Sequence, residues 1–185
     1  MRSDVLNSNS NSYGDFDFVT HSKDIAFATE RWQDLVENGI LTSNSKTDGE
    51  VDAGLTLEAD NVYVSAWESD ATSAISLPAA TAGAFIAWVQ TADADAAYAM
   101  TISAVSGDTF EQYQEVHIGT GIPAQQDSSV AADDILTITP AATNGGWGQV
   151  GSTFILYCKN DGKWLVKVNG VLKGTGAAGT IAFSS

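Results

Sequence analysis

The stretch STFILYCKNDGKWLVKV, residues 152–168, decides the fold of this 185-residue chain. Two runs rich in β-branched and aromatic residues flank Asn160, Asp161 and Gly162, residue types that favour a turn. A three-residue loop with Gly162 in the left-handed conformation gives the hairpin one uniformly apolar face. The facing pairs are then Cys158 with Trp164, Leu156 with Val166, and Phe154 with Val168. A two-residue loop shifts the pairing by one residue and mixes the faces, so the burial of apolar side chains favours the first register.

The opposite face of this hairpin carries three of the eight basic residues of the chain. Lys159, Lys163 and Lys167 project there together, beside Tyr157, Ile155 and Leu165. Two interpretations remain open. The lysines are the solvated side of an outer strand, where they discourage edge pairing, or they form a basic docking stripe for an acidic partner.

Similar β-like runs follow one another from about residue 51 to the end of the chain. Examples are NVYVSAW (61–67), GAFIAWVQ (83–90) and ILTITP (135–140), and Gly, Asp, Asn or Pro separates the runs. This pattern is typical of an antiparallel β-sandwich, a jelly-roll-like fold or a barrel. No fixed-period repeat indicates a solenoid. The sequence therefore predicts a mainly β domain over residues 51–185.

Residues 1–50 have a different character. The first fourteen are rich in Asn and Ser and are expected to be a mobile arm unless a partner holds them. Phe16 and Phe18 then stand at alternate positions. The spacing of the apolar residues that follow predicts one amphipathic helix over about 22–38, including Trp32. A polar segment after this helix places a domain boundary near residue 50.

Charge excludes several classes of function. The chain has 23 acidic and 8 basic residues, a formal net charge of −15, and no Lys or Arg between Thr47 and Cys158. Nucleic acid and anionic membranes are disfavoured as partners because both require clustered Lys and Arg. One cysteine permits neither an internal disulfide nor a cysteine metal cluster. With no signal-like start and no long apolar run, we expect a soluble protein made in the cytoplasm.

Residues that would indicate catalysis are few. His21 and His117 are the only histidines, and no nucleophile motif surrounds the candidate side chains. No acidic cluster matches an EF-hand loop, and GTGAAG (174–179) lacks the context of a phosphate loop. We therefore expect no enzymatic activity, no cofactor and no metal site.

Aromatic residues suggest binding instead. Trp147 lies between glycines in NGGWGQ and is expected to be exposed. Either it stacks on a sugar ring, or it packs as a loop anchor against a neighbouring subunit.

Three sequence motifs resemble those of a β-rich module found in structural proteins of tailed bacteriophages, especially capsid decoration (cement) proteins. The first is the turn Leu77–Gly83 before an apolar strand. The second runs from Tyr98 through Ser106, Gly107 and Asp108 to Phe110, and the third comprises Gly151, Ser152, Leu156, Asp161, Gly162, Trp164 and Val166. The resemblance covers about residues 54–185, and the final segment VNGVLKGTGAAGTIAFSS extends beyond the usual pattern.

The resemblance implies a non-enzymatic virion protein on the capsid surface, with the major capsid protein as partner and a homotrimer as the common assembly. Interface candidates are then Phe16, Phe18, Trp32, Trp147, Lys159, Lys163 and Lys167. The alternative is a host-recognition module of a tail or head fibre that binds surface glycan. A polysaccharide hydrolase is a third possibility, but no paired carboxylates on a recognisable scaffold favour it.

Overall fold

The computed structural model describes residues 22–24, 26–27, 31–94, 98–119, 132–140, 148–172 and 179–185. For residues 112–119 and 172 it describes only the backbone. The predictions for Phe16, Phe18 and Trp147 fall outside the described residues.

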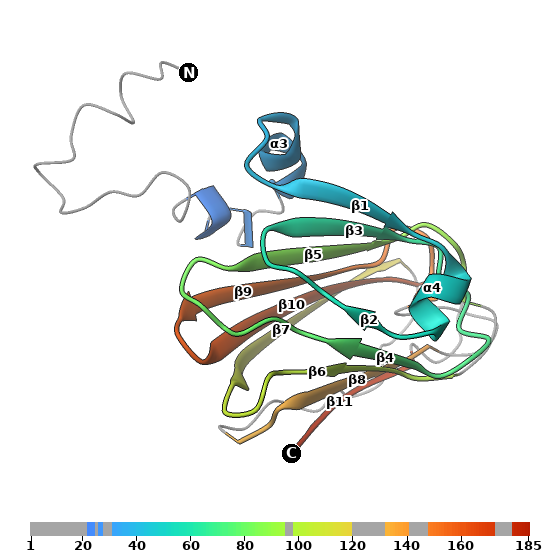
Figure 1. The fold of residues 1–185 in the computed structure, drawn as a ribbon. Coiled ribbons are helices and arrows are strands. Elements are labelled where there is room, and N and C mark those ends of the chain that lie inside the picture. Colours follow the sequence, from blue (N-terminus) through green and yellow to red (C-terminus); the bar gives the residue numbers. More distant parts are fainter. Residues whose placement is uncertain are drawn as a thin grey trace, which may run out of the picture.

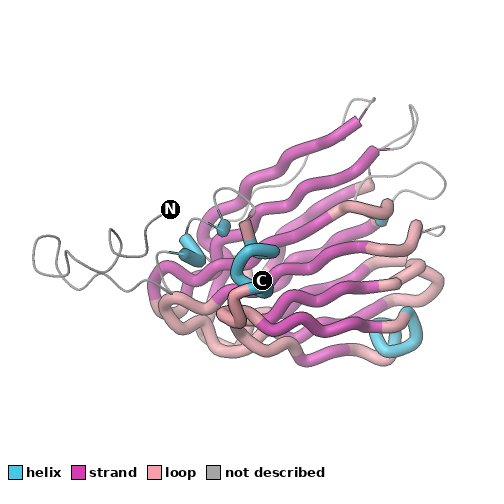
Figure 2. The backbone as a smooth tube through the Cα atoms, turned by 90° about the horizontal axis from the view of Figure 1, so that it is seen from above, coloured by secondary structure: helices cyan, strands magenta, loops and turns pink. Residues whose placement is uncertain are grey.

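Two sheets stack face to face in a β-sandwich-like arrangement, which confirms the predicted mainly β fold (Figure 1). Viewed from above, the axes of the strands are nearly aligned (Figure 2). The six-stranded sheet has the order β1 (Thr42–Lys46), β3 (Asn61–Ser65), β5 (Phe85–Gln90), β9 (Thr153–Asn160), β10 (Lys163–Leu172) and β7 (Thr109–Gly119). The five-stranded sheet has the order β11 (Thr180–Ser184), β8 (Ile135–Thr139), β6 (Met100–Ser103), β4 (Ser73–Ser76) and β2 (Leu55–Thr56).

Parallel pairing is more frequent than the sequence predicts. Among the described strands, β1–β3, β3–β5, β2–β4, β4–β6 and β7–β10 pair in parallel, and the other four pairs are antiparallel. From β1 to β6 the chain crosses to the other sheet at every step, so each strand returns beside the strand two before it in the same direction. The sandwich is therefore mixed rather than antiparallel.

The alternation of strands β1 to β6 between the two sheets leaves no regular repeat in the sequence. Paired residues are 19 positions apart in the first turn (Thr42 and Asn61) and 25 apart in the next (Asn61 and Ile86). Because the connections vary in length, the spacing drifts and no fixed period can be detected.

The hairpin of β9 and β10 has the predicted register. Trp164 lies opposite Cys158, Val166 opposite Leu156 and Val168 opposite Phe154, with a bulge between Lys163 and Trp164. Gly162 has φ 78°, the left-handed conformation that the three-residue loop requires. Local turn chemistry and apolar alternation were therefore sufficient to place these two strands.

The main core fills the space between the sheets. Trp88 stacks on Phe154 with ring centroids 5.2 Å apart and on Tyr63 at 6.2 Å. Trp67 and Trp164 are also fully buried in this core. Burial of these large aromatic side chains provides much of the hydrophobic stabilisation of the sandwich.

A second apolar cluster lies on the outer face of the six-stranded sheet. Residues of the N-terminal segment, among them Ala26, Leu35 and Leu41, pack there against Phe85, Ile155, Tyr157 and Leu165. The predicted helix over 22–38 corresponds to helical residues at 22–24 and 26–27 and to a separate helix α3 (Trp32–Glu37), which begins after Arg31. The polar segment after α3, expected to be a linker, contains β1 and a further short helix, α4 (Asp48–Asp52).

Candidate functional site

One part of each of the three motifs that carry the phage resemblance lies in a group of contacts at one end of the sandwich. Asp108 Oδ2 accepts a hydrogen bond from the Ala80 N–H at 2.7 Å, and the Gly162 N–H donates to the Ala80 carbonyl at 2.8 Å. Asp161 Oδ1 accepts from the Ala82 N–H at 2.7 Å. We call this set of contacts around Ala80, Ala82, Asp108, Asp161 and Gly162 the loop junction. Its two aspartates bond backbone amides, so in this structure they hold loops together.

Cys158 lies beside the loop junction and is fully buried. Its Sγ contacts the Asn160 carbonyl at 3.0 Å, and burial raises the pKa of the thiol above its ordinary value. A thiol that stays protonated is a poor nucleophile and a poor metal ligand. Cys158 is therefore a packing residue.

The lysines do not form one solvated stripe. Lys159 is exposed at the tip of the hairpin, and Lys163 donates a hydrogen bond from Nζ to Thr109 Oγ1 at 2.8 Å. Lys167 is only 6% exposed. The apolar neighbours expected on this surface, Ile155 and Tyr157, are buried under the N-terminal segment. Sequence alternation identified the face correctly but could not show that another part of the chain covers it.

Trp32 belongs to that covering layer. Its side chain is partly buried and packs against the second cluster, while Phe27 of the same layer contacts Tyr157 with ring centroids 5.9 Å apart. The layer is also fastened by an ion pair, because Lys23, 4% exposed, bonds Asp60 Oδ1. The same Asp60 oxygen accepts from the Phe85 N–H at 3.2 Å, which links the layer to β5.

Three carboxylates that sequence reasoning did not single out come together at the other end of the molecule. Asp48 and Asp52 lie on α4, Asp70 lies on the loop before β4, and one oxygen of each lies within 4.8 Å of the others. Burial raises the pKa of Asp52, and the hydrogen bond with Asp70 and the charge of Asp48 raise it further. Ser73 Oγ donates to Asp52 Oδ1 at 3.2 Å. Carboxylate oxygens suit a cation such as Ca²⁺, which would reduce the repulsion among these three groups. A proton shared between Asp52 and Asp70 would reduce that repulsion as well.

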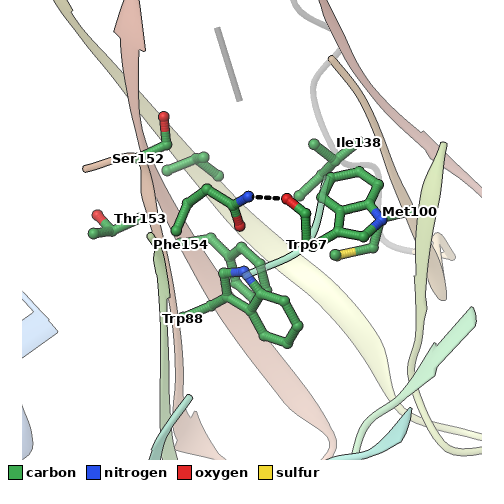
Figure 3. A pocket seen from close by; sticks show the side chains of 9 residues that line it. Trp67, Trp88, Met100, Ile138, Ser152, Thr153 and Phe154 are labelled. Atoms are coloured by element: carbon green, nitrogen blue, oxygen red, sulfur yellow. Dashed lines mark hydrogen bonds between the residues drawn. The ribbon is translucent and has the colours of Figure 1, made fainter. Parts of the chain in front are cut away.

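A small cavity lies inside the sandwich, lined by Trp67, Trp88, Gln90, Phe154 and their neighbours (Figure 3). Its enclosed volume is about 10 Å³, close to the room of one water molecule. Gln90 Nε2 donates to the Trp67 carbonyl, and the buried Trp67 Nε1 finds no hydrogen-bond acceptor among the described residues. The cavity is too small for a sugar or a cofactor.

The described side chains contain no histidine, because His21 lies outside the described residues and only the backbone of His117 is described. None of the helices in the described part of the chain is long and apolar enough to cross a bilayer.

No family model matches the chain, and no curated protein matches it. The fold and the geometry therefore define a β-sandwich-like domain with an N-terminal covering layer.

Proposed function

We propose that this chain is a non-enzymatic virion structural protein, a capsid decoration (cement) protein that binds the outer surface of a tailed-phage head as a trimer and stabilises it. The loop junction is the observation that carries the proposal. The motifs that resemble the phage module are far apart in the sequence, yet Asp108, Asp161 and Gly162 bond the Ala80–Ala82 turn directly. These contacts support the proposal because they bring parts of the three motifs into one local arrangement.

The remaining features fit a protein that works through its surface. The cavity between the sheets has room for about one water molecule, so the described part of the sandwich interior offers no space for a substrate or a cofactor. The net charge of −15 keeps an exposed outer face soluble and is unsuited to nucleic acid. Multivalent binding over many capsid sites would give such a protein its affinity, with the N-terminal residues reaching towards neighbouring subunits.

Rebinding to particles stripped of this protein tests the proposal. Purified protein is expected to saturate the stripped heads and to raise their resistance to heat, and deletion of residues 1–20 is expected to weaken that rebinding. The variant Glu37→Gln is a matched control, since it changes one exposed charge that is not among the interface candidates and does not touch the core. Failure of the full-length protein to rebind at saturating concentration would overturn the proposal.

The glycan-binding alternative has fewer candidate platforms in this structure. Trp67, Trp88 and Trp164 are between 0% and 2% exposed, so none of them can stack on a sugar ring. Of the tryptophans in the β domain, Trp147, outside the described residues, is then the one on which a glycan site would depend. Saturable binding on a glycan array that Trp147→Ala abolishes would favour this alternative over the capsid role.

A further inference from the structure

Strand β1 leaves an open hydrogen-bonding edge on the six-stranded sheet. Among the described strands it is the outermost of this sheet and pairs only with β3 (Figure 1). The Thr42 N–H donates to the Asp60 carbonyl at 2.9 Å, and the Lys46 carbonyl accepts from the Ala66 N–H at 2.9 Å. Because alternate residues of a parallel strand bond the same neighbour, the backbone groups of Ser43 and Ser45 point away from the sheet.

The usual protections of an edge strand are weak at this position. Ser43 and Ser45 are exposed, small and uncharged, and no described residue bonds their N–H or C=O groups. The strand has no proline and no bulge. Its single charged residue, Lys46, lies at the end and contacts Glu50 at 3.8 Å. An incoming strand can therefore approach the backbone of β1 closely.

The charge around this edge selects the partner. Between residues 31 and 70 the chain has nine acidic residues and two basic residues, Lys46 and Arg31, which pairs with Asp34 at 3.0 Å. Helix α3, with exposed Asp34 and Glu37, lies where β1 begins, and α4, with exposed Glu50, follows where it ends (Figure 1). A strand laid along β1 consequently has acidic groups at both of its ends.

We propose that the β1 edge binds an extended, basic segment of another protein by strand addition, with backbone hydrogen bonds to Ser43 and Ser45 and Lys or Arg side chains next to α3 and α4. A second copy of this chain fits less well. Antiparallel pairing of two β1 strands would bring the acidic α3 of one copy towards the acidic α4 of the other. The inference is independent of the proposed function, because it rests on β1 and its surroundings alone.

Selection from a library of random peptides displayed on yeast, with the full-length protein as bait, tests this site. The enriched peptides are expected to combine β-branched residues with a net positive charge and to bind more weakly as salt increases. Ser45→Pro removes an outward N–H but no bond to β3, and is expected to weaken binding about tenfold or more. Ser45→Ala, which keeps the backbone donor, is the matched control and should bind like the unaltered protein.

Each other outcome contradicts the proposal. Peptides that bind Ser45→Pro and Ser45→Ala equally would locate binding elsewhere, provided both variants unfold at the same temperature as the unaltered protein. Enrichment of acidic or neutral peptides would refute the charge argument. Sedimentation showing a dimer that Ser45→Pro dissociates would assign the edge to a second copy. Amide exchange gives a second measurement, since a bound peptide should slow exchange at Ser43 and Ser45, and unchanged rates there would contradict strand addition.

Discussion

The two aspartates of the loop junction are expected to differ in their contribution to stability. Each accepts one backbone N–H at 2.7 Å, but Ala80, the donor to Asp108, is 5% exposed, whereas Ala82, the donor to Asp161, is exposed. Removing Asp108 leaves a buried N–H without an acceptor. Removing Asp161 leaves an N–H that water can satisfy.

Asp108→Ala is therefore expected to lower the free energy of unfolding by about 2–3 kcal/mol, because the lost charged hydrogen bond is not replaced. Asp161→Ala is expected to cost about 0.5–1 kcal/mol. For a chain of this size the first change corresponds to a fall of about 4–12 °C in Tm. Asp108→Asn keeps an acceptor oxygen at the same position, so its loss of unfolding free energy should lie between those of Asp161→Ala and Asp108→Ala.

Urea unfolding followed by tryptophan fluorescence measures these differences, since Trp67, Trp88 and Trp164 are buried in the folded protein. The slope of free energy against urea should stay the same in all variants, which would show that the extent of unfolding is unchanged. Equal losses for Asp108→Ala and Asp161→Ala would refute the reasoning, because burial of the donor would then have no effect.

Three further predictions concern other parts of the molecule. Because the pKa of Asp52 is raised in the folded state, the folded protein holds that proton more strongly than the unfolded chain, and stability falls as pH rises through the raised pKa. Asp52→Asn should therefore raise Tm at about pH 7 and change it little at about pH 3. A lower Tm at neutral pH would instead indicate that the Asp52 and Asp70 carboxylates together bind a cation. Asp60→Ala should lower the free energy of unfolding by about 3 kcal/mol, because it leaves Lys23 buried and unpaired. Lys23→Met should lower it less, because Asp60 stays partly hydrated. Urea unfolding of both variants measures the two losses, and the opposite order would contradict the argument. Cys158 should react with a thiol reagent only in denaturant, and rapid modification of the folded protein would show that the buried position is wrong.

Elements whose partners are close in sequence could be predicted. The Asn-Asp-Gly turn and the alternation on either side of it determined the register of β9 and β10, including the pairing of Cys158 with Trp164. The same reasoning predicted a mainly β domain from short runs and turn residues. These predictions depend on the backbone preferences of turn residues and on the burial of the apolar face of each strand. Both can be inferred from residues that are adjacent in the sequence.

The tertiary structure alone decided which distant strands pair and which surfaces remain exposed. Strands β1, β3 and β5 pair in parallel because the chain crosses between the sheets after each strand. The connections differ in length, so the sequence shows no fixed period that would predict this pairing. Ile155 and Tyr157 are buried because residues more than a hundred positions earlier cover that face, and Asp70 meets Asp48 and Asp52 only through the packing of α4 near β4. Side-chain alternation assigns a residue to a face of a sheet. Whether that face meets water or another layer depends on long-range packing, which no single segment of sequence records.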